Sequence, residues 1–194
     1  LLLLTLLLVN YLLSFTFFRV DLSEDQIHEL SPYTKDKLEN LDDYLKIVDK
    51  IRNVRPDISI TSDFIIGYPG ESNECFEETL DLIKQIGFDD GYSFIYSKRP
   101  GTPASSEPDN ISMSEKKKRL SLVQGLIRTN SEKYLSKLVG TSQQVLIEGT
   151  SKTDPIKLVG RTFTNKIVNF SGSKDLIGKI IDVNIIGSNR KSLD

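Results

Sequence analysis

Cysteine and histidine are almost missing from this sequence of 194 residues, which contains one of each, Cys75 and His28. A disulfide needs two cysteines, and a zinc site built by the protein needs several cysteine or histidine ligands. An iron–sulfur cluster needs three or four thiolates. The chain by itself is therefore expected to hold none of these centres. Cys75 lies on a predicted helix, where its default role is that of a small packed residue, and such thiol usage fits a reducing cytoplasm.

Charge is absent from the first 18 residues, which run from Leu1 to Phe18 and are rich in leucine. This length is near the lower limit for a membrane span. A secretory signal would begin with basic residues and end at a small-residue cleavage site, and neither is visible. The chain also begins with Leu rather than Met. Three interpretations stay open: a membrane anchor, a buried helix of a larger protein, or sequence foreign to the native product.

Positive charge is scarce in the first half and abundant in the second, although the whole chain has a net charge of only -2. Residues 1–113 contain 10 Lys and Arg against 20 Asp and Glu, whereas residues 114–194 contain 15 against 7. A basic half of this kind suggests a polyanionic partner. The alternative is that these lysines and arginines only solvate helix faces.

Residues 41–103 alternate between helical and strand patterns. Apolar residues at helical spacing follow Leu41 as far as Pro56, and a β-rich run covers residues 58–66. A second helix is expected between a Ser72 cap and Gly87, and a second strand covers residues 92–96. This strand–helix–strand order predicts a parallel α/β unit.

The remaining residues predict a linker, a long helix and a small barrel. A polar linker spans residues 104–113, and a long helix with a basic face begins at Ser114. After Gly140, short β-prone runs are separated by Gly, Asp-Pro and Ser-Gly turns, at residues 144–148, 157–162, 166–170 and 179–186. Such closely spaced strands predict a β-barrel of the oligonucleotide-binding kind.

A glycine-containing loop follows the first predicted strand. Gly67 and Gly70 flank Tyr68-Pro69 and lead to the second helix. A strand end of this kind exposes backbone N–H groups where open α/β folds bind ligands, and glycine lets the backbone approach a flat ligand. The pattern alone is weak, because most such turns are only turns.

Two longer segments carry a specific resemblance. The first, TSDFIIGYPGE at residues 61–71, resembles the SDFIVGFPGET segment of the radical S-adenosylmethionine methylthiotransferases. Compared with the general radical-SAM pattern G-x-I-x-G-x-x-E, Asp63 replaces the first glycine and Glu71 is a displaced acid. The second, FIYSKRPGTPA at residues 94–104, resembles the F-x-YS-x-RPGTPA segment of the same family.

The C-terminal residues resemble a TRAM domain, a small RNA-binding β-barrel. Residues 160–170, GRTFTNKIVNF, are similar to the GRTxxNRxVNF strand pair of the tRNA-modifying branch of the family, MiaB. Arg and Lys on such a barrel hold phosphates, and Asn reads a base edge. Phe163 is expected either to stack on a base or to join the core.

The resemblance covers about residues 41–194 and implies the fold class: α/β, with the C-terminal strand–helix units of a radical-SAM partial barrel at residues 41–135, followed by an all-β TRAM barrel, OB-like, at residues 137–194. Residues 1–40 are expected to be unlike the family and remain unassigned. The family's C-x-x-x-C-x-x-C loop is not in the sequence. The resemblance therefore implies a truncated or misassembled product that is not catalytically competent alone.

The chemistry implied by the resemblance is methylthiolation at C2 of a prenylated adenosine beside a tRNA anticodon. S-adenosylmethionine and a 4Fe–4S cluster are the cofactors of the whole enzyme, and its partner is tRNA in the cytoplasm; no protein partner and no membrane are expected. The residues expected to line the cofactor site are Gly67, Gly70, Glu71 and Ser97, and those expected to contact RNA are Arg161, Thr162, Asn165 and Lys166. No residue is given a catalytic or metal-binding role.

Two rival functions stay open. The chain could be a non-catalytic RNA-binding module that uses the TRAM barrel and the basic helix. It could instead be a membrane-anchored protein that reuses the α/β segment.

Overall fold

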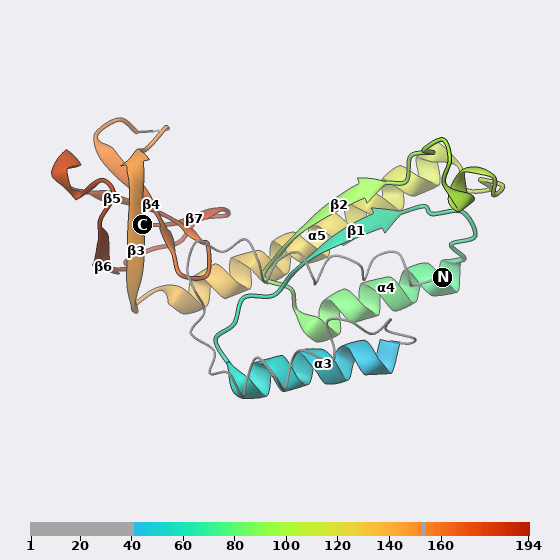
Figure 1. The fold of residues 1–194 in the computed structure, drawn as a ribbon, viewed down its shortest axis with the longest axis horizontal. Helices are drawn as coiled ribbons and strands as arrows, with labels where there is room; N and C mark the ends of the chain where they lie inside the picture. The colour runs from blue at the N-terminus through green and yellow to red at the C-terminus, as the bar shows by residue number, and fades with distance from the viewer. Residues whose placement is uncertain (1–40, 153) are drawn as a thin grey trace. The chain divides into compact units, whose positions relative to one another are not determined.

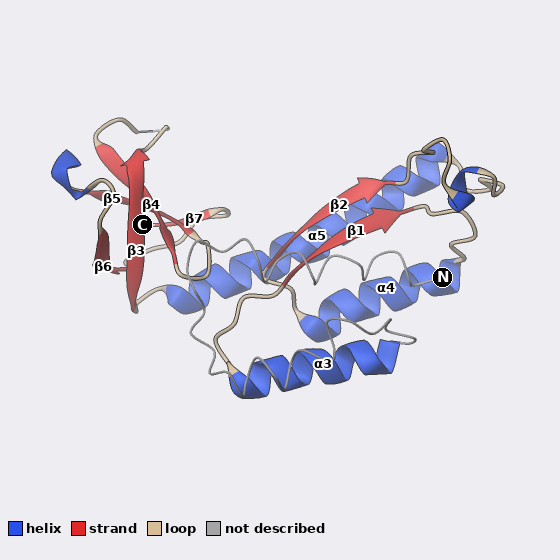
Figure 2. Cartoon of the chain, in the orientation of Figure 1, coloured by secondary structure: helices blue, strands red, loops and turns tan. Residues whose placement is uncertain are grey.

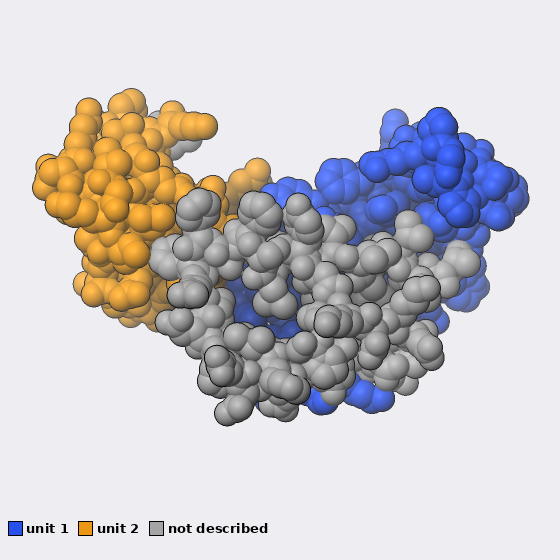
Figure 3. All heavy atoms as spheres, in the orientation of Figure 1, with its two compact units in different colours: residues 1–127 blue, residues 128–194 orange. Residues whose placement is uncertain are grey.

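The computed structural model describes residues 41–152 and 154–194, which form two compact units that divide between Ile127 and Arg128 (Figure 3). The elements along the chain, in order, are α3 (Leu41–Val54), β1 (Thr61–Ile66), α4 (Asn73–Ile86), β2 (Asp90–Ile95), η2 (Pro103–Ser105), α5 (Met113–Leu138), β3 (Ser142–Thr150), β4 (Lys157–Thr162), β5 (Ile167–Ser171), η3 (Lys174–Leu176), β6 (Ile180–Asn184) and β7 (Ser192–Leu193) (Figure 1). The boundary between the units lies inside α5.

The first unit contains a parallel pair of strands covered by helices. β1 and β2 pair in register from Thr61 opposite Asp90 to Ile66 opposite Ile95. The face of β1 that carries Phe64 and Ile66 packs into one core with side chains from α3, α4 and α5. The expected parallel α/β unit is therefore present. Two strands alone do not make a barrel, so the partial barrel remains a proposal.

The helix α4 begins and ends where the sequence predicts. The Ser72 side chain accepts a hydrogen bond from the Cys75 N–H at 3.2 Å, as an N-cap does. At the other end Gly87 is left-handed, with φ of 62°, and its N–H donates to the Ile83 carbonyl. Glycine adopts this conformation without the steric cost that a Cβ brings.

The first strand starts later than predicted, at Thr61 rather than at residue 58. Ile60 exchanges hydrogen bonds with Asp89: its N–H donates to the Asp89 carboxylate at 2.7 Å, and its carbonyl accepts from the Asp89 N–H at 2.9 Å. The Ile60 N–H is thus bonded to the Asp89 side chain rather than to a backbone carbonyl of β2. Ile60 therefore does not join the β1–β2 ladder.

The second unit is built on a five-stranded sheet (Figure 2), which agrees with the closely spaced strands that the sequence predicts, and its closure into a barrel remains a proposal. The strand order is β6-β3-β4-β5-β7, and the pairs are antiparallel except β5 with β7. Its core takes residues from most strands and Leu135 from the last turns of α5. The sequence analysis did not predict η3 or β7, because a stretch of two or three residues carries no periodic signal.

The pairing of β3 with β4 needs a glycine at position 160. A Cβ there would lie 2.5 Å from the Leu146 carbonyl oxygen and 2.5 Å from Val145 Cγ1. By contrast, a Cβ at Gly149 on the facing strand would have nothing within 4 Å. The structure therefore has room for a methyl group at Gly149 and none at Gly160.

We expect Gly160→Ala to lower the free energy of unfolding by about 2–3 kcal/mol, because backbone atoms must move to admit the methyl group. Gly149→Ala is the matched control and should change it by less than about 0.5 kcal/mol. Urea titrations followed by far-ultraviolet circular dichroism measure both values. Equal midpoints for the two variants would contradict the described strand pairing.

Candidate functional site

The loop between β1 and α4 is shaped by two glycines. Gly67 and Gly70 have φ angles of 72° and 82°, in the left-handed region that glycine adopts readily. A Cβ on Gly67 would lie 2.6 Å from both Cγ and Cδ of Lys116. Gly67 is thus required by its conformation and by the buried lysine that crosses it.

Glu71 fixes the same loop from the other side. Its Oε2 accepts from the Gly67 N–H at 2.9 Å and from Arg119 Nη1 at 2.7 Å. The two side chains are 11% and 5% exposed, so this ion pair is shielded from water. Glu71 Oε2 therefore holds the loop through these two bonds.

Arg119 gathers more of this region. Its Nη2 donates to Asn73 Oδ1 at 2.6 Å, and its Nη1 also donates to the Glu71 carbonyl at 3.3 Å. The guanidinium lies 5.0 Å from the centre of the Phe76 ring, within cation–π range. One side chain on α5 thereby ties together the loop and the first turn of α4.

Lys116, which is buried, makes a second ion pair nearby with the more exposed Asp109. It is 1% exposed, and its Nζ lies 2.7 Å from Asp109 Oδ2 and 5.7 Å from the centre of the Tyr96 ring. The hydrogen bond from Lys116 holds the pKa of the Asp109 carboxyl below its ordinary value. In the part of the chain that the structure describes, the buried Tyr96 hydroxyl has no hydrogen-bond partner.

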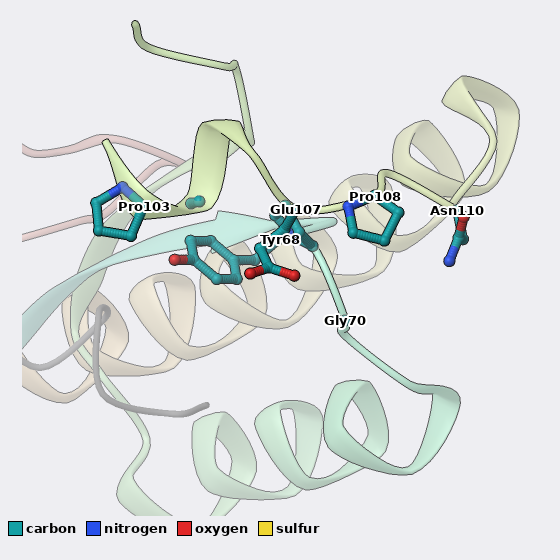
Figure 4. A pocket seen from close by; sticks show the side chains of 8 residues that line it. Tyr68, Gly70, Pro103, Glu107, Pro108 and Asn110 are labelled. Atoms are coloured by element: carbon teal, nitrogen blue, oxygen red, sulfur yellow. The ribbon is translucent and has the colours of Figure 1, made fainter. Parts of the chain in front are cut away.

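A partly open pocket of about 410 Å³ lies beside this loop (Figure 4). Volumes of a few hundred Å³ are typical of small-molecule sites. The lining combines an aromatic ring, apolar surface, a carboxylate and an amide, from Tyr68, Pro69, Gly70, Pro103, Ala104, Glu107, Pro108 and Asn110. The pocket thus joins the segments that follow β1 and β2 in the sequence.

Of the four residues expected to line a cofactor site, the structure places only Gly70 in this pocket. Gly67 is covered by Lys116, and Glu71 pairs with Arg119. Ser97 is exposed and does not line the pocket. Glu107 and Asn110, which also line the pocket, are not predictable from the sequence, because they lie in a polar stretch without a motif.

The hairpin between β4 and β5 places the four residues expected to contact RNA. Asn165 has φ of 62°, the one left-handed residue other than glycine among those that the structure describes. The Thr162 carbonyl accepts from the Asn165 N–H, and the Thr162 N–H donates to the Lys166 carbonyl, both at 2.9 Å. This is a three-residue hairpin loop whose last residue is left-handed, a position that asparagine tolerates.

Thr162 and Lys166 point into the protein. Thr162 is 1% exposed, and its hydroxyl accepts from the Lys166 N–H at 3.0 Å, which closes the loop. Lys166 is 8% exposed, and its Nζ lies 4.8 Å from the centre of the Tyr134 ring. Alternation along a strand explains why these two side chains lie on the opposite face from Arg161.

Arg161 and Asn165 lie on the outer side of the hairpin. Arg161 Nε donates to both carboxylate oxygens of Glu148, at 3.1 and 3.2 Å, and its Nη1 donates to Asn165 Oδ1 at 3.0 Å. The Arg161 and Glu148 side chains are 39% and 43% exposed. The sequence analysis missed Glu148, which lies 13 residues before its partner.

In the part of the chain that the structure describes, no three His, Cys, Asp or Glu side chains are grouped so that they could hold a metal ion. No helix in residues 41–152 or 154–194 has the length and apolarity needed to cross a membrane. The stretch at residues 1–18 that prompted a membrane interpretation lies outside the described residues.

Comparison with known proteins gives a consistent set of matches. The TRAM domain model matches residues 136–194. A tRNA-2-methylthio-N(6)-dimethylallyladenosine synthase of Actinobacillus succinogenes is 52% identical over 143 residues, which are 74% of this chain and 30% of that protein. Proteins of the same name from Yersinia pestis and Haemophilus influenzae are each 47% identical, over 94% and 90% of the chain and 38% and 36% of the relatives.

The chain therefore spans about a third of the length of the curated relatives that it matches. The resemblance inferred from the motifs is confirmed by these identities. Because the Yersinia pestis match includes 182 of the 194 residues, it extends into residues 1–40, where the sequence analysis expected no likeness to the family.

The Arg119–Glu71 pair leads to a prediction about stability. Arg119→Met removes the cation and leaves the Glu71 carboxylate buried, so we expect the free energy of unfolding to fall by about 2–4 kcal/mol. Lys118→Met is the control, since Lys118 is 72% exposed and lies 3.9 Å from Glu115; its effect should stay below about 0.5 kcal/mol. If chemical denaturation gives the same loss for both, the pair does not hold the loop.

Proposed function

We propose that the chain belongs to the bacterial tRNA methylthiotransferase (MiaB) family and is the tRNA-binding portion of such an enzyme. The identities of 47–52% to proteins named tRNA-2-methylthio-N(6)-dimethylallyladenosine synthase carry this proposal. The basic balance of residues 114–194, with 15 Lys and Arg against 7 Asp and Glu, supports it, since tRNA is a polyanion.

We assign residues 41–135 to the C-terminal part of a radical-SAM domain and residues 137–194 to the TRAM module. The parallel pair β1–β2 with its helices then represents the last strand–helix units of a partial barrel. The five-stranded sheet agrees with a small RNA-binding barrel.

The reaction proposed for the whole enzyme is 2-methylthiolation of an N6-prenylated adenosine near the anticodon. S-adenosylmethionine, when bound, supplies the methyl group and the radical. The pocket lined by Tyr68 and Gly70 fits part of such a molecule, because it offers an aromatic ring, exposed backbone, and polar groups from Glu107 and Asn110. Gly67 and Glu71 do not line the pocket, but the hydrogen bond from the Gly67 N–H to the Glu71 carboxylate holds the loop that does.

The second cofactor does not fit the residues present. A 4Fe–4S cluster needs three or four thiolates, and the sequence contains only Cys75, on α4. We propose that thiolates from outside these 194 residues are needed for catalysis, so that this chain is not competent alone.

For the RNA contact we retain Arg161 and Asn165, which lie outward on the β4–β5 hairpin. Thr162 and Lys166 support the contact from within, by closing the loop and by packing over Tyr134. The proposed partner is tRNA, and the proposed location is the cytoplasm, where tRNA is modified in bacteria.

A non-catalytic RNA-binding module is the second candidate. The single cysteine and the basic second half favour it, because RNA binding needs neither a cluster nor a radical. The two candidates agree on RNA contact and differ in whether this chain takes part in a reaction.

We expect the full chain to bind tRNA with an affinity that falls steeply as salt increases, because the bound cations displace counterions from the phosphates. Replacing Lys137 and Lys174 with Gln should reduce the slope of log affinity against log salt by about one to two units. The control with the same charge loss in the acidic half replaces Lys84 and Lys98, and should keep the parental slope. Fluorescence anisotropy measures all three; a salt-independent affinity would refute RNA binding by this half.

A further prediction concerns the metal. After anaerobic reconstitution with iron and sulfide, the full chain should show no cluster absorption and should not cleave S-adenosylmethionine, because one thiolate cannot hold a cluster. Cys75→Ser should behave identically. A brown protein that turns over the cofactor would show that the chain is competent alone.

A further inference from the structure

The strand β3 has a bulge at Glu148. Ile147 pairs with Gly160 and Gly149 pairs with Val159, so Glu148 between them has no partner residue on β4. Bulges redirect a side chain from the regular alternation of a strand. Leu146 is the residue of β3 that pairs with Arg161. The carboxylate of Glu148, two residues further along β3, nevertheless contacts Arg161 Nε.

The contacts of Arg161 determine how Asn165 is oriented. A guanidinium has five N–H donors and no acceptor, so the asparagine amide must turn its oxygen toward Arg161. The 3.0 Å contact from Nη1 to Oδ1 follows this requirement. The Asn165 NH₂ group is then turned away from the arginine, and Asn165 itself is exposed.

Two donor groups of this cluster have no partner among the described residues. Arg161 uses Nε and one N–H of Nη1, and no bond from Arg161 Nη2 or Asn165 Nδ2 exists within the part of the chain that the structure describes. Both acceptors of the cluster, the Glu148 carboxylate and the Asn165 oxygen, already accept from Arg161. A ligand that offers acceptors can therefore pair with these two donor groups.

We propose that Glu148, Arg161 and Asn165 form one recognition site that binds the acceptor edge of an unpaired guanine in RNA. This inference rests on the proposed function and adds a base preference to it. Guanine presents two adjacent acceptors, O6 and N7. Adenine and cytosine place a donor amino group at the corresponding edge, where it would face the N–H groups of Arg161 Nη2 and Asn165 Nδ2.

Glu148 acts as a positioning residue. Its two oxygens accept from Nε and fix the plane of the guanidinium, while Nη2 has no bond to a described residue. A bidentate contact to guanine depends on this fixed plane. An acidic side chain near RNA repels phosphates, so its removal should tighten binding if it has no positioning role.

The first test compares nonaribonucleotides of uridine that carry one central guanosine, adenosine or 7-deazaguanosine. The full chain, followed by fluorescence anisotropy, should bind the guanosine form at least about fivefold more tightly than the adenosine form. The 7-deaza form lacks N7 and should lose most of this preference. Equal binding of all three would mean that the cluster contacts only phosphates, and would overturn the inference.

The second test uses variants that keep the fold or the charge. Asn165→Gly preserves the left-handed turn, and Arg161→Lys preserves the positive charge; each should reduce the guanosine preference to below about twofold. Glu148→Gln should reduce it equally, and should reduce it no further when Arg161 is already Lys. If Glu148→Gln tightens binding to every oligonucleotide and keeps the preference, the positioning role is wrong.

The two proposals fail differently. If the parent chain binds neither the oligonucleotides nor tRNA, the proposed function is refuted together with the base preference. If tRNA binds with the predicted salt dependence but guanosine has no advantage, only the base preference is refuted.

Discussion

The buried guanidinium of Arg119 is the contact on which the first unit depends. It joins α5 to the loop after β1 and to the start of α4, through Glu71, Asn73 and the Phe76 ring. A buried charge is tolerated only when it is paired and hydrogen-bonded, so the position of each partner constrains the others. The loop beside the pocket is consequently fixed by side chains that do not line the pocket.

In the hairpin of the second unit, buried polar contacts likewise fix the positions of the exposed side chains. Thr162 and Lys166 are bound inside, which leaves Arg161 and Asn165 outside. The left-handed turn at Asn165 and the bulge at Glu148 bring three polar side chains from two strands into one cluster. Backbone irregularities thus place the groups that are available to a ligand, as is common at functional sites.

Much of this fold could be predicted from the sequence, because its signals are local. Ser72 and Gly87 mark the ends of α4 as expected, and the repeated turns after Gly140 predict the second sheet. The site was less predictable. The sequence motif contains Glu71, but its partner Arg119 lies 48 residues away, and Glu148 lies 13 residues from Arg161. Long-range pairs of this kind become visible only when the elements are packed.

The outer side of the β4–β5 hairpin is the proposed RNA contact. Hydrogen–deuterium exchange of the full chain, with and without saturating tRNA, tests this proposal. We expect slower exchange of backbone amides around Glu148 and in residues 161–167 when tRNA is bound. If tRNA binds and exchange slows elsewhere while these amides are unchanged, the hairpin is not the RNA contact.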